Sequence, residues 1–341
     1  MPMQNLSPVA VAAWTDLLRH LRDGAVAGLR GTPRLKQVGR KSYWYDHFRI
    51  GAQTVDRYIG EDSPELQARI ARAETLRAAM REREREQARL VRILRAEGCL
   101  MTDRATGQVV SAMARAGVFR LGGTLIGTQA FRCYEGELGQ RIGFDQAAMT
   151  DDVDIASFER LSIVLQDQVT EPLTEVFQGL SFEPLPSVDG ARVWRWRQSS
   201  QQTLVEFLTP AFGAEEAIRD LPALGVSAQA LHYLNYLIAD PIQVPLLYRS
   251  GVLVQVPRPE RFAIHKLIVA DRRRDGPETL KARKDRAQAE FLIRALAEDR
   301  PEDLREALEL ARDSGPAWRS RLQATLSRMP QVAAMLQGLG A

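Results

Sequence analysis

Three short acidic and glycine-containing segments constrain this chain more than any other feature. Gly127-Thr128 follows the apolar pair Leu125-Ile126, Asp152-Val153-Asp154 has the look of a strand, and Glu206 lies in a second strand-like segment. Alternate residues of a strand point to the same face, so Asp152 and Asp154 can converge. Convergent carboxylates repel one another unless a cation lies between them, and oxygen ligands suit Mg²⁺. The segments therefore predict a metal site of the kind that phosphoryl and nucleotidyl transfer require.

The alternative interpretation is that these acids simply face solvent, since a lone Asp-x-Asp occurs on many edge strands. Two residues favour the site. Gly127 allows a close backbone approach to a phosphate, and a helix beginning there favours anions at its N-terminus. Glu206 lies in mid-strand between two apolar residues, which favours a role in a site over simple exposure to solvent.

Composition limits the classes of protein to which the chain can belong. It has 341 residues, 45% of them hydrophobic, and a net charge of +3, so no overall affinity for polyanions follows from its charge. Cys99 and Cys133 give neither a disulfide framework nor a zinc spacing. No signal-peptide pattern follows Met1 and no apolar run is long enough to span a bilayer, so we expect a cytoplasmic protein without a membrane partner.

The first 100 residues form the first predicted unit. A helix is expected over 9–29, a β-hairpin over 42–59, and a long helix from Ser63-Pro64 to about Ala96, with a solvated Arg/Glu face at 81–89. Aromatic and basic residues alternate over 40–58, which suits contact with a nucleic acid. The other interpretation, which we favour, is that these aromatic rings pack on the long helix.

The remaining sequence predicts two further units, 101–256 and 257–341. In the first, helices at 105–116, 127–134 and 170–178 alternate with a strand at 153–155 and a hairpin at 192–208; a second hairpin is expected over 246–256. The tail reads as helices over 260–272, 278–297, 301–313 and 316–328. The predicted fold class is α+β, with a small mixed sheet preceded by a hairpin and long helix and followed by a helical bundle.

The order of these motifs resembles the polymerase β-type nucleotidyltransferase superfamily. Its signature is a Gly-containing turn, an Asp-h-Asp/Glu segment and a third acid on a neighbouring strand. The residues of these motifs most resemble a bacterial branch related to abortive-infection-type nucleotidyltransferase toxins. The motifs of that branch match Ile126-Gly127-Thr128-Gln129-Ala130, Thr150-Asp151-Asp152-Val153-Asp154 and Val205-Glu206-Phe207-Leu208-Thr209-Pro210. A tail segment, Lys281-Ala282-Arg283-Lys284-Asp285, resembles a further motif of that branch.

The resemblance implies a role for each matching residue. Asp152, Asp154 and Glu206 would hold one or two Mg²⁺ ions, with Glu206 also able to take the proton of the acceptor. Gly127 and Thr128 would cradle the terminal phosphates of an NTP, and Lys266 or Lys284 would add positive charge. The implied activity is transfer of NMP from an NTP to a hydroxyl on a protein, an RNA or a small molecule.

The sequence departs from that pattern at three places. Thr128 and Asp152 are further apart than the dozen or so positions usual in the superfamily, the third acid is Glu206 rather than Asp, and Gln288 stands where the tail motif has Asp. These departures keep open a catalytically silent protein of the same fold, such as a toxin–antitoxin component or an RNA-binding adaptor. A sequence-specific DNA binder is a weaker third alternative, because no basic recognition helix is visible.

Overall fold

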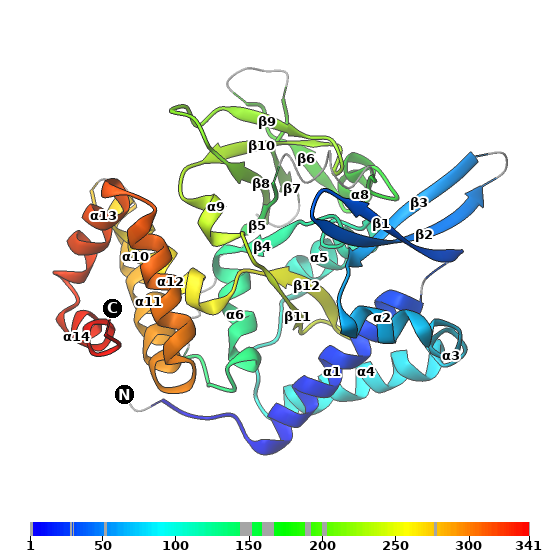
Figure 1. Cartoon of the computed structure of the whole chain (residues 1–341), viewed down its shortest axis with the longest axis horizontal. Helices are drawn as coiled ribbons and strands as arrows, with labels where there is room; N and C mark the ends of the chain where they lie inside the picture. The colour runs from blue at the N-terminus through cyan, green and yellow to red at the C-terminus, as the bar shows by residue number, and fades with distance from the viewer. Residues whose placement is uncertain are drawn as a thin grey trace.

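The computed structural model describes residues 3–27, 29, 31–50, 53–143, 152–158, 167–187, 192–199, 203–275 and 278–340. It is an α+β structure, as predicted, in which a mixed sheet lies between an N-terminal unit and a layer of C-terminal helices (Figure 1). None of the helices within these ranges combines the length and apolar character that crossing a lipid bilayer requires.

The N-terminal unit contains a sheet with one strand more than the predicted hairpin. Strands β1 (Thr32–Val38), β2 (Lys41–Ile50) and β3 (Gln53–Glu61) form an antiparallel sheet in that order. Tyr43 and Tyr45 are buried, and both rings contact Tyr58. The aromatic rings of this segment thus pack on one another, whereas packing on the long helix was the favoured interpretation. Residues 51 and 52, where a turn was expected, lie outside the described residues.

The predicted long helix is divided into three, α2 (Pro64–Ala71), α3 (Ala73–Ala78) and α4 (Met80–Ala96). Its start is as expected, since the Ser63 hydroxyl accepts a hydrogen bond from the Leu66 backbone N–H. No Gly or Pro marks the breaks. Arg83 leaves the expected solvated face and is buried, donating a hydrogen bond to the Leu76 carbonyl near the break between α3 and α4. Both α3 and α4 pack on α1 (Pro8–Ala27).

The central sheet brings three acidic positions onto neighbouring strands. Its main order is β4-β5-β8-β10-β9, with β7 also paired to β8 and β6 to β7. Strand β8 is parallel to both β5 and β10, whereas β4 and β7 run antiparallel to their partners. The strands are β4 (Thr124–Ile126), β5 (Asp152–Ala156), β6 (Phe182–Pro184), β7 (Arg195–Gln198), β8 (Leu204–Pro210), β9 (Ile218–Leu221) and β10 (Val226–Leu231).

Helices connect and cover these strands, and a separate hairpin leads to the tail. Helices α5 (Arg104–Ala116), α6 (Gly127–Glu137), α8 (Leu173–Gly179) and α9 (Leu234–Leu237) belong to the central part, and β11 (Ile242–Leu246) pairs with β12 (Val252–Val256). The tail holds α10 (Pro259–Arg272), α11 (Thr279–Asp299), α12 (Pro301–Asp313), α13 (Pro316–Leu326) and α14 (Pro330–Gly338), the last of which was not predicted. α10 packs on α11, α12 and α13.

Candidate functional site

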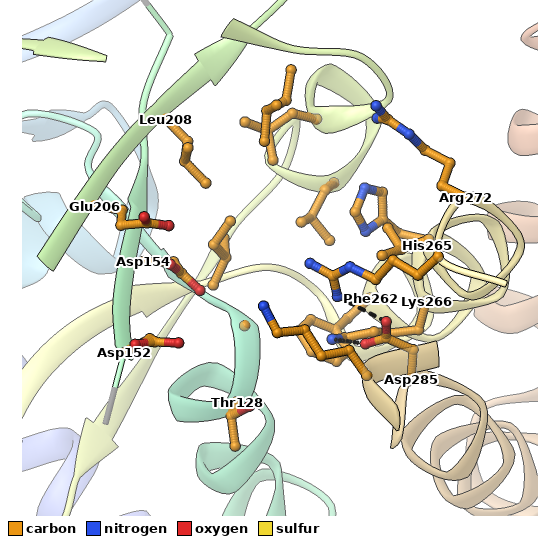
Figure 2. A pocket seen from close by; sticks show the side chains of 18 of the residues that line it. Thr128, Asp152, Asp154, Glu206, Leu208, Phe262, His265, Lys266, Arg272 and Asp285 are labelled. Carbon is orange, nitrogen blue, oxygen red and sulfur yellow. Dashed lines mark hydrogen bonds and ion pairs between the residues drawn. The ribbon is translucent and has the colours of Figure 1, made fainter. Parts of the chain in front are cut away.

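A cavity of about 440 Å³ lies between the central sheet and helices α10 and α11. Side chains or backbone of all seven residues predicted as site residues line it: Gly127, Thr128, Asp152, Asp154, Glu206, Lys266 and Lys284. They come from five elements, the start of α6, strands β5 and β8, and helices α10 and α11. Figure 2 shows the acids on the sheet side and the cations on the helix side. The cavity therefore has a carboxylate wall facing a basic wall.

Strand register places the carboxylates of the first wall. Asp154 lies directly opposite Glu206 in the parallel β5–β8 pair, and Asp152 is two residues away on the same face. Burial, and then the neighbouring charges of Glu206 and Asp152, raise the pKa of Asp154 to about 7. Burial also raises the pKa of Glu206, although Arg195 across the strand pair opposes the shift.

The Asp154 and Glu206 carboxyl groups belong to paired residues of neighbouring strands, and they repel one another when both are ionised. In the part of the chain that the structure describes, no three His, Cys, Asp or Glu side chains are already gathered as a metal site. The donor set nevertheless fits a hard divalent cation, because a cation would relieve the repulsion among these carboxylates.

Gly127 is required at the start of α6 for two reasons. Its φ of +67° is one that other residues rarely adopt, and a Cβ atom added there would lie 2.5 Å from Asp154 Oδ2. The backbone of the turn thus touches the carboxylate wall. Thr128 follows in the first turn of α6. The backbone N–H groups of a first helical turn have no partner within the helix, so this end of α6 favours an anion.

The basic wall contains one buried ion-pair network and one lysine outside it. Lys266 Nζ lies 2.6 Å from Asp285 Oδ1, and Arg273 binds the other oxygen of Asp285 at 2.8 Å. Burial favours a raised pKa for Asp285, but these two cations outweigh it and hold the pKa below its usual value. The predicted Lys266 therefore lines the cavity with its ammonium committed to Asp285.

Lys284 differs from Lys266 in having no ion-pair partner within 4 Å among the described residues. Burial, followed by the nearby charge of Lys266, lowers the pKa of Lys284 from 10.5 to about 8. A half-buried ammonium without an ion-pair partner can accept one, and a phosphate group of a ligand would supply it.

Several lining residues were not predicted from the sequence. Trp194, His265, Arg272 and Arg273 all line the cavity. Burial and the surrounding cations lower the pKa of His265 to about 3, so its imidazole is neutral. The Arg272-Arg273-Arg274 run beside the predicted Lys266 was the available signal for two of them. Asp151, which precedes Asp152 in the motif, lies outside the described residues.

The region between Thr128 and Asp152 is only partly an insertion. Helix α6 continues to Glu137, so the first residues of this region lengthen the helix that begins beside the cavity. Cys133 lies on this helix in a fully buried position, where burial raises its thiol pKa to about 12. A thiol held protonated by burial is a poor nucleophile.

Comparison with known families agrees with this architecture. A family described as nucleotidyltransferase matches residues 104–313, which include the central sheet, both cavity walls and the first tail helices. The match covers more than half of the chain, and the chain belongs to the nucleotidyltransferase family. A second family, a domain of unknown function, matches residues 14–68. No curated protein and no solved structure matched the chain.

Proposed function

We propose that this chain is a Mg²⁺-dependent enzyme that transfers NMP from an NTP to a hydroxyl acceptor. The observation that carries the proposal is the cavity in which three carboxylates face a basic wall, within a member of the nucleotidyltransferase family. Finer agreement with the bacterial branch supports it, since the motif residues Gly127, Asp154 and Lys284 all line that cavity.

The carboxylate wall would hold the metal. Asp152, Asp154 and Glu206 supply the ligands for one or two Mg²⁺ ions, which neutralise charge on the nucleotide phosphates when bound. Glu206 is half-buried and its pKa is raised, which favours a group that takes the proton of the acceptor hydroxyl.

The other end of the triphosphate would lie against α6 and the basic wall. Thr128 and the backbone at Gly127 would bind terminal phosphate oxygens, and Lys284 would pair with them. Lys266 would act through Asp285 by keeping α10 and α11 together beside the cavity. We place the function in the cytoplasm, where NTPs are available, and retain units 1–100, 101–256 and 257–341 as the proposed domains.

Calorimetry tests this function. Mg²⁺-dependent binding of an NTP should be measurable for the wild type and lost in Asp152→Ala and Asp154→Ala. Asp313→Ala, on the exposed side of α12, is the matched control and should bind normally. Incubation with labelled NTPs and cell lysate should then show a labelled acceptor and released pyrophosphate. Absence of NTP binding by the wild type would contradict the proposal.

A silent binding protein of the same fold is the second candidate function. Two observations favour it: the described carboxylates are not gathered as a metal site, and residues 14–68 match a domain family of their own. Exposed Arg34 and Arg40 offer the charge for nucleic-acid contact through the small sheet, whereas Tyr43 and Tyr45 are too buried to stack on bases. RNA or protein binding that survives Asp152→Ala, without NTP binding, would support this toxin–antitoxin or adaptor role.

A further inference from the structure

The cavity has two chemically different ends. Thr128 and Asp152 lie at one end in Figure 2, and Leu208 and Arg272 at the other. Leu208 belongs to a group of apolar side chains in the lining, which also contains Leu231, Leu234 and Leu237. An NTP is divided in the same way, into a triphosphate and a base with apolar faces. The apolar end is therefore where the nucleoside fits, on the proposed function given above.

A strained residue interrupts the apolar wall. Tyr233 has φ 70° and ψ −7°, the left-handed region that a bulky side chain rarely adopts. Its two chain neighbours, His232 and Leu234, both line the cavity. Strain of this kind persists only where surrounding contacts hold it, and it occurs often at functional sites.

Helix α13 supplies those contacts. The Trp318 ring meets the Tyr233 ring edge-on, with centres 4.8 Å apart. Arg321 Nε donates a hydrogen bond of 3.0 Å to the Tyr233 hydroxyl, and its guanidinium also lies near the Tyr233 ring. We call Tyr233, Trp318 and Arg321 the Tyr233 clamp.

Helix α10 joins the clamp to the cavity. Arg321 also binds the buried Asp271 at 3.0 Å, which fixes α13 against α10. The guanidinium of the next residue, Arg272, lies 5.7 Å from the centre of the Tyr233 ring. Arg272 also forms an ion pair with Glu216 at 3.1 Å. Glu216 in turn accepts a 2.8 Å hydrogen bond from the His232 backbone N–H. The residue before Tyr233 is thus tied to α10 through Glu216 and Arg272, while Tyr233 itself is tied to α13 through Arg321.

We propose that Tyr233 is a positioning residue that holds the nucleoside end of the cavity in shape through the clamp to α13. The inference rests on the proposed function and adds a role for the C-terminal helix α13. The clamp should therefore affect one end of the cavity only. Loosening it should weaken recognition of the nucleoside and leave binding of a bare triphosphate, at the opposite end, unchanged.

The test compares two ligands. Calorimetry with Mg²⁺ and each of ATP, CTP, GTP and UTP identifies the tightest nucleotide for the wild type, and inorganic tripolyphosphate serves as the bare anion. Arg321→Met and Tyr233→Ala should raise the Kd of that nucleotide at least tenfold while changing the Kd of tripolyphosphate less than twofold. Tyr233→Phe keeps the ring contacts, so it should retain most of the affinity and serves as the variant that folds if Tyr233→Ala does not.

Controls separate this inference from the function on which it rests. Arg319→Met, on the same helix, removes an exposed side chain that donates to the Arg312 carbonyl, and this variant should bind both ligands as the wild type does. Lys284→Met should weaken both ligands. An equal loss for nucleotide and tripolyphosphate in Arg321→Met, or no loss for either, overturns the clamp while leaving the proposed function standing if Lys284→Met behaves as expected. No binding of any nucleotide by the wild type overturns both.

Discussion

Gly127 provides the most direct test at the scale of a single residue. In Gly127→Ala the new methyl group meets Asp154 Oδ2 at 2.5 Å in a backbone conformation with positive φ. We expect a loss of about 1–3 kcal/mol in the free energy of unfolding and at least a tenfold loss of NTP affinity, because Asp154 must move. Chemical denaturation and calorimetry measure the two effects.

The control for this substitution is Gly179→Ala at the end of α8. A Cβ atom added there has no neighbour within 4 Å, so stability and NTP affinity should stay near their wild-type values. Normal NTP binding by Gly127→Ala would show that the turn tolerates displacement of Asp154 and would contradict the assigned role.

Lys284 should make nucleotide binding depend on pH. Its pKa of about 8 means that the ammonium loses its proton as the pH rises through 8, so the Kd of an NTP should rise between pH 7.5 and 9.5. Lys284→Arg stays charged and should remove that dependence. A wild-type Kd that is constant over this range would contradict phosphate contact by Lys284.

The same lysine should also reduce stability. Its folded pKa lies below the unfolded value of 10.5, so the cost of burying the ammonium is full below about pH 8 and disappears as the pH rises toward 10.5. Lys284→Met should therefore raise the thermal midpoint at pH 7 while weakening NTP binding, a trade between stability and function. Thermal denaturation at pH 7 and pH 10 checks the sign, since the gain should shrink at the higher pH.

At the scale of elements, the α10–α11 contact depends on a buried charge. Asp285 is buried and bound by Lys266 and Arg273. Asp285→Asn leaves those cations without their counter-charge and should lower the free energy of unfolding by about 3–5 kcal/mol. Adding Lys266→Met should recover part of this loss in chemical denaturation. The exposed Arg305–Glu302 pair on α12 is the comparison, where Glu302→Ala should cost at most about 1 kcal/mol.

Element prediction succeeded where the signal was local. Ser63 and Pro64 marked the start of α2, and helices α10 to α13 begin close to the predicted positions. It failed where tertiary contacts decide the outcome. The first strand of the small sheet, β1, has Pro33 and little apolar alternation, so its pairing with β2 is not visible in the sequence. Likewise no Gly or Pro announces the breaks near Arg72 and Ala79, which accompany packing of α3 and α4 on α1.

At the scale of the whole molecule, the same distinction explains which cavity residues were found. The carboxylates and Gly127 belong to short motifs with a fixed spacing, and strand register brings them together. Tyr233 has no such signal, because its strained conformation and its contacts with Arg321 and Trp318 join residues more than eighty positions apart. The ion pair between Lys266 and Asp285 also depends on tertiary contact, because it joins two helices, and the sequence does not reveal it.

The carboxylate wall should lower the free energy of unfolding of the whole chain. The pKa of Asp154 is raised from 3.8 to about 7, so this group destabilises the metal-free protein progressively as the pH rises from about 4 through 7, and fully above 7. Asp154→Asn should therefore raise the free energy of unfolding at pH 8, by on the order of 2–4 kcal/mol, and change it little at pH 4. Wild type should gain stability from Mg²⁺ and NTP together, about 2.7 kcal/mol at a ligand concentration of 100 Kd, and the variant should not. Equal stability of the two proteins at pH 8 without metal would contradict the repulsion between Asp154 and its neighbours on which the metal site depends.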